Sequence, residues 1–350
     1  MIESIEFTNF KALRHTTLPL APFTLLLGPN GSGKSTVLQV IQDIAVLAQQ
    51  PVRNQQGTNL VYTSQVWATA RSVTAKDPAI ATSVKLRLRW KELCIIAAFN
   101  CRPNDEGDFH VQFTLENGSP YSGTSELLQW FARMKKYALD PVAIAQPCPV
   151  SSKPMGANGQ GLPAVLDNLK DNYPERWDSL LAEMRRWLPE YDHIVFDKPD
   201  EGSKGIALRT KKGGHRIPAK DLSQGTLVAL ALLTLAYLPD PPSVVGLEEI
   251  DHSLHPRLLR NLQDALYRLS YPESCGEKRP PIQVIATTHS PYLLDLYRDH
   301  PEEVVLAQKE GLEVEMKRLT DIEHYADILG ESPLSEMWYS GILGGVSVRP

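Results

Sequence analysis

The segment GPNGSGKST, residues 28–36, constrains the fold of this chain more than any other. It matches the pattern G-x-x-x-x-G-K-[ST], in which glycines let backbone N–H groups turn inward around phosphates. An apolar run of strand length, FTLLLG, precedes it, and apolar residues at helical spacing follow it. Strand, glycine loop and helix together predict a site for ATP made of Gly28, Pro29, Asn30, Gly31, Ser32, Gly33, Lys34, Ser35 and Thr36.

Two side chains of this loop have roles that follow from phosphate chemistry. We expect Lys34 to reach the β- and γ-phosphates and the Ser35 hydroxyl to bind Mg²⁺. The loop says little about which reaction follows nucleotide binding.

A second feature is the run SVVGLEEIDHSLHP, residues 243–256, in which an apolar strand ends in two adjacent carboxylates. Enzymes with such a phosphate loop hold magnesium between the loop hydroxyl and an acidic residue at the tip of a neighbouring strand. We therefore expect Glu248 to bind the metal and Glu249 to polarise the attacking water. A divalent cation would relieve the repulsion between the two acids. A solvated acidic loop without a role is the alternative.

Two histidines, His252 and His255, lie just beyond these acids. Their H-x-x-H spacing lacks the i, i+4 register of a helical zinc pair. We therefore favour a structural interpretation, in which His255 ends the loop and Pro256 occupies the first turn of the next helix.

Polar residues also stand at two other element ends. DLSQGTLVALALL, residues 221–233, places Ser223, Gln224 and Gly225 before an apolar helix, whose N-terminus favours an anion. Because the chain already has one phosphate loop, a second anion site makes sense if it faces the nucleotide of another subunit. In VIATTHSPYLLD, residues 284–295, an apolar strand ends in His289, where parallel sheets bind ligands. A histidine that only caps a turn is the alternative.

In this order, GPNGSGKST, LSQGTL, GLEEIDHSLHP and TTHSP resemble the motifs of ABC-type ATPase heads of the SMC and RecF group. The chain is more closely similar to the stand-alone ATPases related to the OLD (overcoming lysogenisation defect) proteins, and the resemblance covers almost its whole length. It implies that residues 28–36 are the Walker A loop and that Ser223–Gly225 is the signature, which contacts the γ-phosphate held by a partner subunit. It further implies a Walker B role for Glu248, a catalytic role for Glu249, a D-loop at residues 251–254 and a switch histidine at His289.

The chain departs from the family pattern in two places, and one family residue stays unassigned. Glu248 stands where most ABC heads have Asp, although related OLD-like heads also have Glu there. The signature reads LSQGT instead of LSGGQ, which argues against a transporter subunit. No Q-loop glutamine can be assigned, because Gln55, Gln56 and Gln65 all fit.

The fold class that these patterns and the resemblance imply is α/β, a P-loop NTPase of the ABC-head type with an antiparallel β-subdomain and an inserted helical lobe. We expect a single head in which residues 1–50 and 205–350 form the nucleotide-binding core and residues 51–204 form an inserted β meander and helical lobe. Residues 50–80 look like loop, and we expect helices at 125–139, 163–171 and 174–188.

The composition bounds the location of the protein. The longest apolar stretch, residues 226–238, is shorter than the roughly 18 residues that a membrane span requires, and we expect it to be a buried helix. Met1 leads directly into a strand pattern, and the cysteines form no C-x-x-C pair. These features predict a cytoplasmic protein.

The resemblance also suggests partners. Full-length OLD nucleases append a TOPRIM domain whose metal site needs D-x-D, a pattern that occurs nowhere in this chain. We therefore expect a head-to-tail, ATP-dependent dimer that controls a separately encoded nuclease or toxin, in bacterial antiphage defence. A nucleotide-sensing scaffold with little turnover and a RecF-like DNA-repair ATPase are the alternatives.

Nucleic acid is a further partner to consider. The net charge of −5 gives no global basic field. KLRLRW nevertheless places Lys85, Arg87 and Arg89 on one face of a strand, where they would suit a DNA backbone. RMKK at 133–136 and Arg185–Arg186 would extend this basic stripe. Solvated sheet surface is the alternative interpretation.

Overall fold

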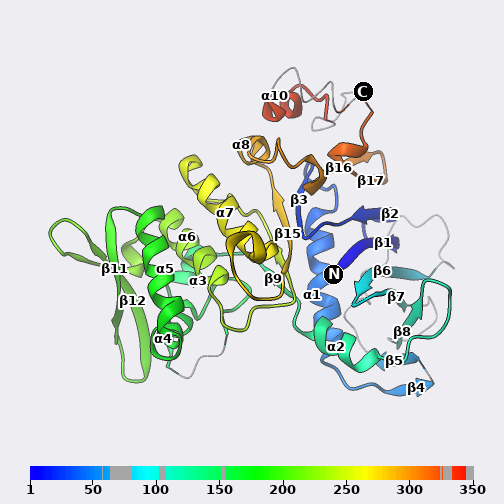
Figure 1. The fold of residues 1–350 in the computed structure, drawn as a ribbon, viewed down its shortest axis with the longest axis horizontal. Helices are drawn as coiled ribbons and strands as arrows, with labels where there is room; N and C mark the ends of the chain where they lie inside the picture. Colours follow the sequence, from blue (N-terminus) through cyan, green and yellow to red (C-terminus); the bar gives the residue numbers. More distant parts are fainter. Residues whose placement is uncertain are drawn as a thin grey trace. The chain divides into compact units, whose positions relative to one another are not determined.

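The structure of the protein is a computed structural model that describes residues 1–56, 58–63, 81–101, 108–150, 154–323, 325 and 333–343. The chain divides into two compact units (Figure 1). The first unit comprises Met1–Lys136, Ser243–Leu247 and Gln283–Pro350, and the second comprises Tyr137–Pro242 and Glu248–Ile282.

The first unit is a three-layer structure with helix α1, Lys34–Ala48, between two sheets (Figure 1). The buried residues of α1 share one apolar core with Phe7 and Leu86 of a seven-stranded sheet and with Leu26 and Ile285 of a six-stranded sheet. The seven-stranded sheet has the order β2-β1-β6-β7-β8-β5-β4. Its strands are β1 Ile2–Phe10, β2 Leu13–Pro19, β4 Asn54–Gln56, β5 Asn59–Thr63, β6 Thr82–Trp90, β7 Leu93–Cys101 and β8 Asp108–Leu115.

The six-stranded sheet has the order β17-β16-β3-β15-β14-β9. Strands β14, β15, β3 and β16 are parallel to one another, so their carboxyl ends share one edge of the sheet, and β17 is antiparallel to β16. Its strands are β3 Phe23–Leu27, β9 Lys135–Tyr137, β14 Val244–Leu247, β15 Gln283–Thr288, β16 Val304–Glu310 and β17 Glu313–Arg318. Helices α2 Thr124–Ala132, α8 Pro291–Asp295 and α10 Leu334–Tyr339 and the 3-10 turns Pro301–Glu303 and Leu319–Asp321 complete the unit.

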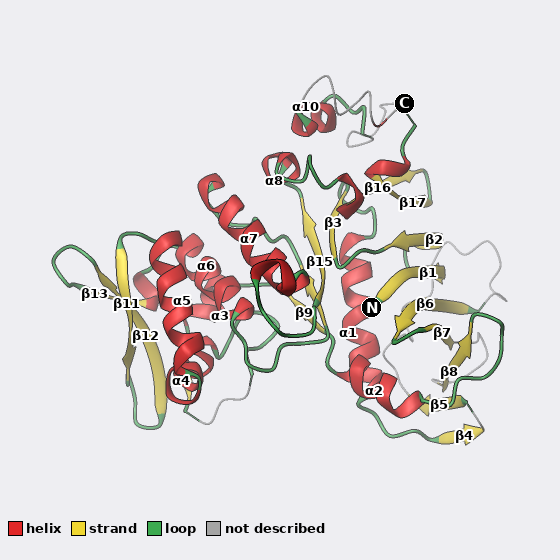
Figure 2. Ribbon diagram, in the orientation of Figure 1, coloured by secondary structure: helices red, strands yellow, loops and turns green. Residues whose placement is uncertain are grey.

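The second unit is mainly helical, with one small antiparallel sheet of order β10-β12-β11 and β13 paired to β12 (Figure 2). Its longest apolar helix, α6, is buried from Thr226 to Ala236, as predicted for residues 226–238. The helices are α3 Pro141–Ala145, α4 Leu162–Asn172, α5 Pro174–Trp187, α6 Gln224–Ala236 and α7 Leu259–Ser270. The strands are β10 Cys148–Pro149, β11 Tyr191–Asp197, β12 Ser203–Thr210 and β13 Arg216–Pro218, and the 3-10 turns are Ala219–Asp221, Pro256–Leu258 and Pro272–Cys275.

The α/β fold with an antiparallel β-subdomain is confirmed, and three local expectations differ from the structure. The helix expected at 125–139 ends at Ala132, because Lys135–Tyr137 joins the edge of the six-stranded sheet instead. Residues 54–56 and 59–63, expected to be loop, are paired strands. The expected division at residue 50 lies inside the first unit, because β6 pairs with β1 and so joins the meander to the N-terminal strands.

No helix in the described ranges combines the length and the apolar character that a membrane crossing needs.

Candidate nucleotide-binding site

The glycine loop of the first unit connects β3 to α1, as the sequence predicted. A Cβ on Gly28 would lie 2.6 Å from the Ala307 carbonyl oxygen and 2.6 Å from Ser32 Oγ, so no side chain fits there. Gly33 has a φ of +86°, and its Cβ would lie 2.5 Å from Leu13 Cδ2. Close packing and backbone conformation therefore both require glycine at these two positions.

The interior of the loop presents hydrogen-bonding groups of the kind that bind phosphate. Helix α1 begins without a capping side chain, which leaves its first N–H groups for a ligand. Ser32 is fully buried, and its Oγ has no hydrogen-bond partner among the described residues. Lys34 is also buried, and its Nζ donates to the carbonyls of Gly28 at 2.7 Å and Pro29 at 3.0 Å. The orphaned hydroxyl and the uncapped helix fit a triphosphate.

One basic residue, Lys309, lies beside the loop without any local sequence signal for that position. Lys309 Nζ lies 3.8 Å from the position of a Cβ on Gly31, and Lys309 forms no ion pair with any described residue. Strand β16 runs parallel to β3 with Leu306 opposite Leu27, which carries the residues after Leu306 alongside the loop. Only this long-range pairing identifies Lys309. The positive side chain adds a second charge near the tip of the loop.

Other strand ends lie at the same edge of the six-stranded sheet. Thr288 at the end of β15 is opposite Leu27, and Leu247 at the end of β14 is opposite Ala286. Buried Thr288 accepts a hydrogen bond from the Ser290 N–H at 2.9 Å, which turns the chain around His289 and leaves that side chain exposed. The first unit thus brings together the glycine loop and His289, and Glu248 follows directly on Leu247.

The acidic residues begin a loop of the second unit. The Glu248 N–H donates to the Tyr137 carbonyl at 2.9 Å, and the Glu248 residue is half-buried. Glu249 is exposed and has a left-handed backbone, with a φ of 47°. Such a conformation is costly for a residue with a Cβ, and it concentrates at functional sites.

His255 ends this loop in the structural arrangement that we favoured. His255 Nδ1 accepts from the Arg257 N–H at 3.2 Å, and Pro256 opens the 3-10 turn that leads into α7. The described residues contain no group of three or more His, Cys, Asp and Glu side chains that could hold a metal ion. Magnesium in phosphate-loop proteins is held by one or two protein groups together with the phosphates, and the Ser35 hydroxyl and the Glu248 carboxylate are groups of that kind.

The signature segment lies in the second unit, next to the loop that follows Glu249. Ser223 caps α6, because its Oγ accepts from the Thr226 N–H at 3.1 Å. A Cβ on Gly225 would lie 2.5 Å from the Ser253 carbonyl oxygen. Ser253 also has a left-handed φ of 66°, and its hydroxyl donates to Gln224 Oε1 at 3.3 Å. Residues 223–225 and Ser253, expected to serve as signature and D-loop, are therefore in direct contact.

The expected basic stripe on β6 is paired with acids. Lys85 lies 4.0 Å from Glu6, Arg87 contacts Glu3 at 3.4 Å and Glu116 at 2.5 Å, and Arg89 contacts Glu3 at 2.6 Å. Because carboxylates neutralise each cation, this face favours the interpretation as solvated sheet surface. The Q-loop stays unassigned: Gln55 and Gln56 lie in β4, and Gln65 lies outside the described residues.

Comparisons with known proteins agree with this arrangement. A model described as "AAA ATPase domain" matches residues 1–98, and one described as "AAA domain, putative AbiEii toxin, Type IV TA system" matches residues 158–295. An OLD nuclease of Thermus scotoductus is 23% identical in an alignment 345 positions long, which covers 85% of this chain and 60% of that protein. The chain is thus similar to AAA-type ATPase domains over two separate segments and to an OLD nuclease over most of its length.

Solved SMC heads share the fold of this chain. A structure of an SMC head bound to the C-terminal winged-helix domain of ScpA matches with a TM-score of 0.61 at 16% identity, over 93% of this chain and 99% of that one. A Pyrococcus furiosus SMC head with an extended coiled coil, bound to the C-terminal domain of ScpA, matches with a TM-score of 0.53 at 12% identity, over 94% and 98% of the two chains. The chain spans about 60% of the length of the OLD nuclease that it resembles.

Proposed function

We propose that the protein binds ATP with Mg²⁺ at residues 28–36 and hydrolyses it within a head-to-tail dimer. The observation that carries this proposal is the glycine loop, where Gly28 and Gly33 leave no room for side chains and Ser32 presents a buried, unpartnered hydroxyl. Such a cradle binds phosphate through backbone N–H groups and a helix N-terminus.

Each site residue has a defined role in the proposed reaction. Lys34 binds the β- and γ-phosphates, Ser35 and Glu248 hold the magnesium ion, and that ion neutralises charge on the phosphates. Glu249 accepts a hydrogen bond from the attacking water and orients it. His289, exposed at the end of β15, donates toward the γ-phosphate.

The dimer is proposed because the glycine loop binds the nucleotide of its own subunit. The signature segment would therefore contact the nucleotide of a second subunit. Ser223 and Gln224 are exposed at the N-terminus of α6, a helix of 13 residues that is otherwise buried. In the dimer, this helix terminus meets the γ-phosphate of the partner subunit's nucleotide, where its dipole stabilises negative charge. Binding of ATP then closes the dimer, and hydrolysis opens it.

A Glu249→Gln variant tests this function. The variant is expected to bind ATP with normal affinity, to lose about 10²–10⁴-fold in turnover, and to accumulate as a dimer in ATP, because the amide cannot act as the base. Glu273→Gln, which makes the same change at an exposed position outside the site, is expected to behave as wild type. Phosphate release and light scattering measure both effects. Normal turnover in Glu249→Gln would refute the catalytic assignment.

We also propose that the ATPase controls an effector, a nuclease or a toxin, which lies outside residues 1–350. A similar protein is named as an OLD nuclease and one matching family description names a toxin, while D-x-D is absent from this chain. These likenesses support a bacterial antiphage role in the cytoplasm. Purification of the protein from its native host, with and without ATP, tests for such a partner, and recovery of the ATPase alone in both conditions would contradict the proposal.

A further inference from the structure

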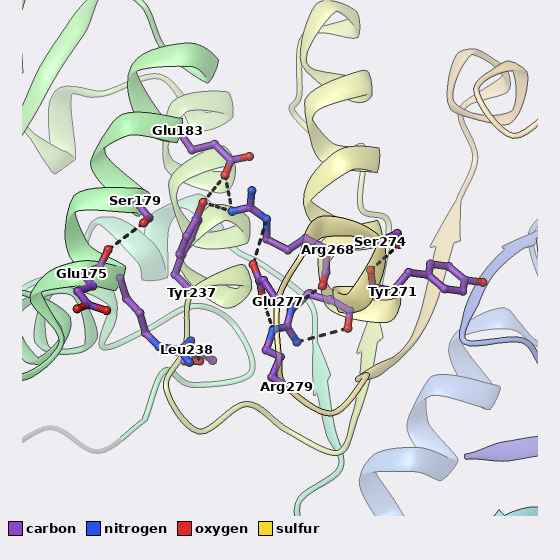
Figure 3. A network of polar contacts seen from close by, with 12 residues as sticks. Glu175, Ser179, Glu183, Tyr237, Leu238, Arg268, Tyr271, Ser274, Glu277 and Arg279 are labelled. Carbon is purple, nitrogen blue, oxygen red and sulfur yellow. Dashed lines mark hydrogen bonds and ion pairs between the residues drawn. The ribbon is translucent and has the colours of Figure 1, made fainter.

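A buried cluster of charged side chains joins three helices of the second unit (Figure 3). The Tyr237 hydroxyl at the end of α6 donates to Glu183 Oε2 of α5 and accepts from Arg268 Nη1 of α7. Arg268 Nη1 also donates to the same Glu183 oxygen at 3.0 Å. Glu183 and Tyr237 are each only 7% exposed, so little water replaces these contacts if one is lost.

The cluster is balanced in charge and continues to the loop after α7. Arg268 Nε lies 3.4 Å from Glu277 Oε1, and Arg279 Nε donates to Glu277 Oε2 at 2.5 Å. Arg279 also donates to the carbonyls of Arg268 and Leu269, which are unpaired within the last turn of α7. Two arginines thus offset two glutamates, and Arg279 caps the helix. Burial raises the pKa of Tyr237, and the Glu183 carboxylate raises it further, so the hydroxyl keeps its proton.

Helices α6 and α7 are also joined at their other ends. The Ser253 carbonyl, which precedes α7, occupies the space where a side chain on Gly225 would lie, and the Ser253 hydroxyl bonds to Gln224. Contacts between the two N-terminal ends and between the two C-terminal ends mean that the helices run side by side in the same direction. The signature segment and the loop of Glu249 are therefore linked through α6 and α7, which contact each other at both ends.

This arrangement has a consequence that rests on the proposed function. In the dimer, the signature of one subunit serves the partner's nucleotide, whereas Glu249 of that subunit serves its own. We propose that the Glu183–Tyr237–Arg268 cluster is a positioning cluster that couples the two nucleotide sites of the dimer. Contact of α6 with one γ-phosphate is transmitted through the cluster to α7 and to the Glu249 loop, because a packed, hydrogen-bonded pair of helices shifts as a unit.

Tyr237→Phe tests the coupling, since it removes one hydroxyl and keeps the ring. Wild type is expected to hydrolyse ATP cooperatively, with a Hill coefficient of about 2, and Tyr237→Phe with a coefficient of about 1. The ATP affinity of the monomer is expected to stay within about twofold, because the glycine loop lies in the first unit. Tyr173→Phe, which makes the same change on a 40% exposed ring outside the cluster, is expected to keep the wild-type coefficient.

Mixed dimers give a second measurement that a purely structural role would not move. A Lys34→Ala subunit is mixed with a subunit that has an intact loop, both of them otherwise wild type or both carrying Tyr237→Phe. The inactive subunit is expected to suppress its neighbour at least fivefold in the wild-type background and less than twofold in the Tyr237→Phe background. Arg268→Lys, which keeps the charge beside Glu183, is expected to retain part of the suppression.

The outcomes separate this inference from the function on which it rests. If wild type forms no dimer in ATP, the proposed function fails. If the wild-type dimer forms and Tyr237→Phe lowers turnover while the Hill coefficient and the suppression stay unchanged, the cluster only stabilises the fold and the inference is overturned. A wild-type dimer with a Hill coefficient of 1 overturns it as well.

Discussion

Replacement of Gly33 by alanine tests the packing of the glycine loop, because two separate costs meet at this residue. A Cβ at a φ of +86° costs about 1–2 kcal/mol. The same Cβ would lie 2.5 Å from Leu13 Cδ2 and 3.3 Å from Leu13 Cγ, and Leu13 is fully buried. Displacing a packed core side chain costs a further 1–3 kcal/mol or so. The first unit is therefore expected to lose about 2–5 kcal/mol of stability.

Gly311→Ala isolates the steric part of this cost. Gly311 lies in the same unit with a φ of +59°, and nothing lies within 4 Å of its Cβ position, so it incurs the backbone cost alone. Hydrogen exchange is followed at amides of α1 that exchange only when the first unit opens. Exchange in Gly33→Ala is expected to be about 5- to 150-fold faster than in Gly311→Ala, since each 1.4 kcal/mol is a factor of ten. Equal rates in the two variants would refute the close-packing argument for the loop.

Four further predictions concern single residues. Lys309→Met is expected to weaken ATP binding about fivefold and ADP binding less. Lys317→Met, which changes a lysine already paired with Glu315, is expected to leave the affinity for both nucleotides unchanged. Equal loss of affinity for ATP and ADP in titration calorimetry would place Lys309 away from the γ-phosphate. Glu249→Gly is expected to melt at a higher temperature than Glu249→Ala, because only glycine avoids the cost of the left-handed backbone, which is about 1 kcal/mol. Equal melting temperatures would show that the loop is unstrained. A hydrogen bond from Arg89 and the charges of Arg89 and Arg87 hold the pKa of Glu3 below 4.5 despite some burial. The Glu3 carboxylate therefore stabilises the fold above pH 4.5, and this stabilisation is lost as the pH falls through the lower pKa of the folded state. Glu3→Gln is expected to reduce the loss of stability in that acid range, and an unchanged pH profile would contradict this. Arg87→Gln in the Glu249→Gln background is expected to leave the salt slope of duplex binding unchanged, since Arg87 is paired with acids, whereas a phosphate contact would lower the slope by about 0.9.

The local parts of the site were predictable because their signals are short. A strand, a glycine loop and a helix are contiguous in residues 23–48, and close packing leaves no room for a side chain on Gly28 or Gly33. The turn at His255 and Pro256 was predictable for the same reason. The roles of Glu248, Glu249 and His289 stay predictions.

Contacts between distant parts of the chain were not predictable. Nothing in the local sequence places Lys309 beside Gly31, Ser253 against Gly225, or Tyr237 against Arg268. The pairing of β1 with β6 likewise joins two segments that are far apart in the sequence and that we expected to belong to different parts of the head. The basic stripe was misleading for the related reason that its acidic partners, Glu3 and Glu116, lie on other strands. Pairing between strands determines these contacts, and no local period reveals it.

A crosslink between two copies of the protein tests the head-to-tail, ATP-dependent dimer. One copy carries Asn30→Cys in the glycine loop and the other carries Ser223→Cys at the start of α6, both in a background in which exposed Cys275 is replaced by serine. A crosslinked heterodimer is expected with ATP and Mg²⁺, and none is expected with ADP. The absence of a crosslink with ATP, or the same yield with either nucleotide, would contradict it.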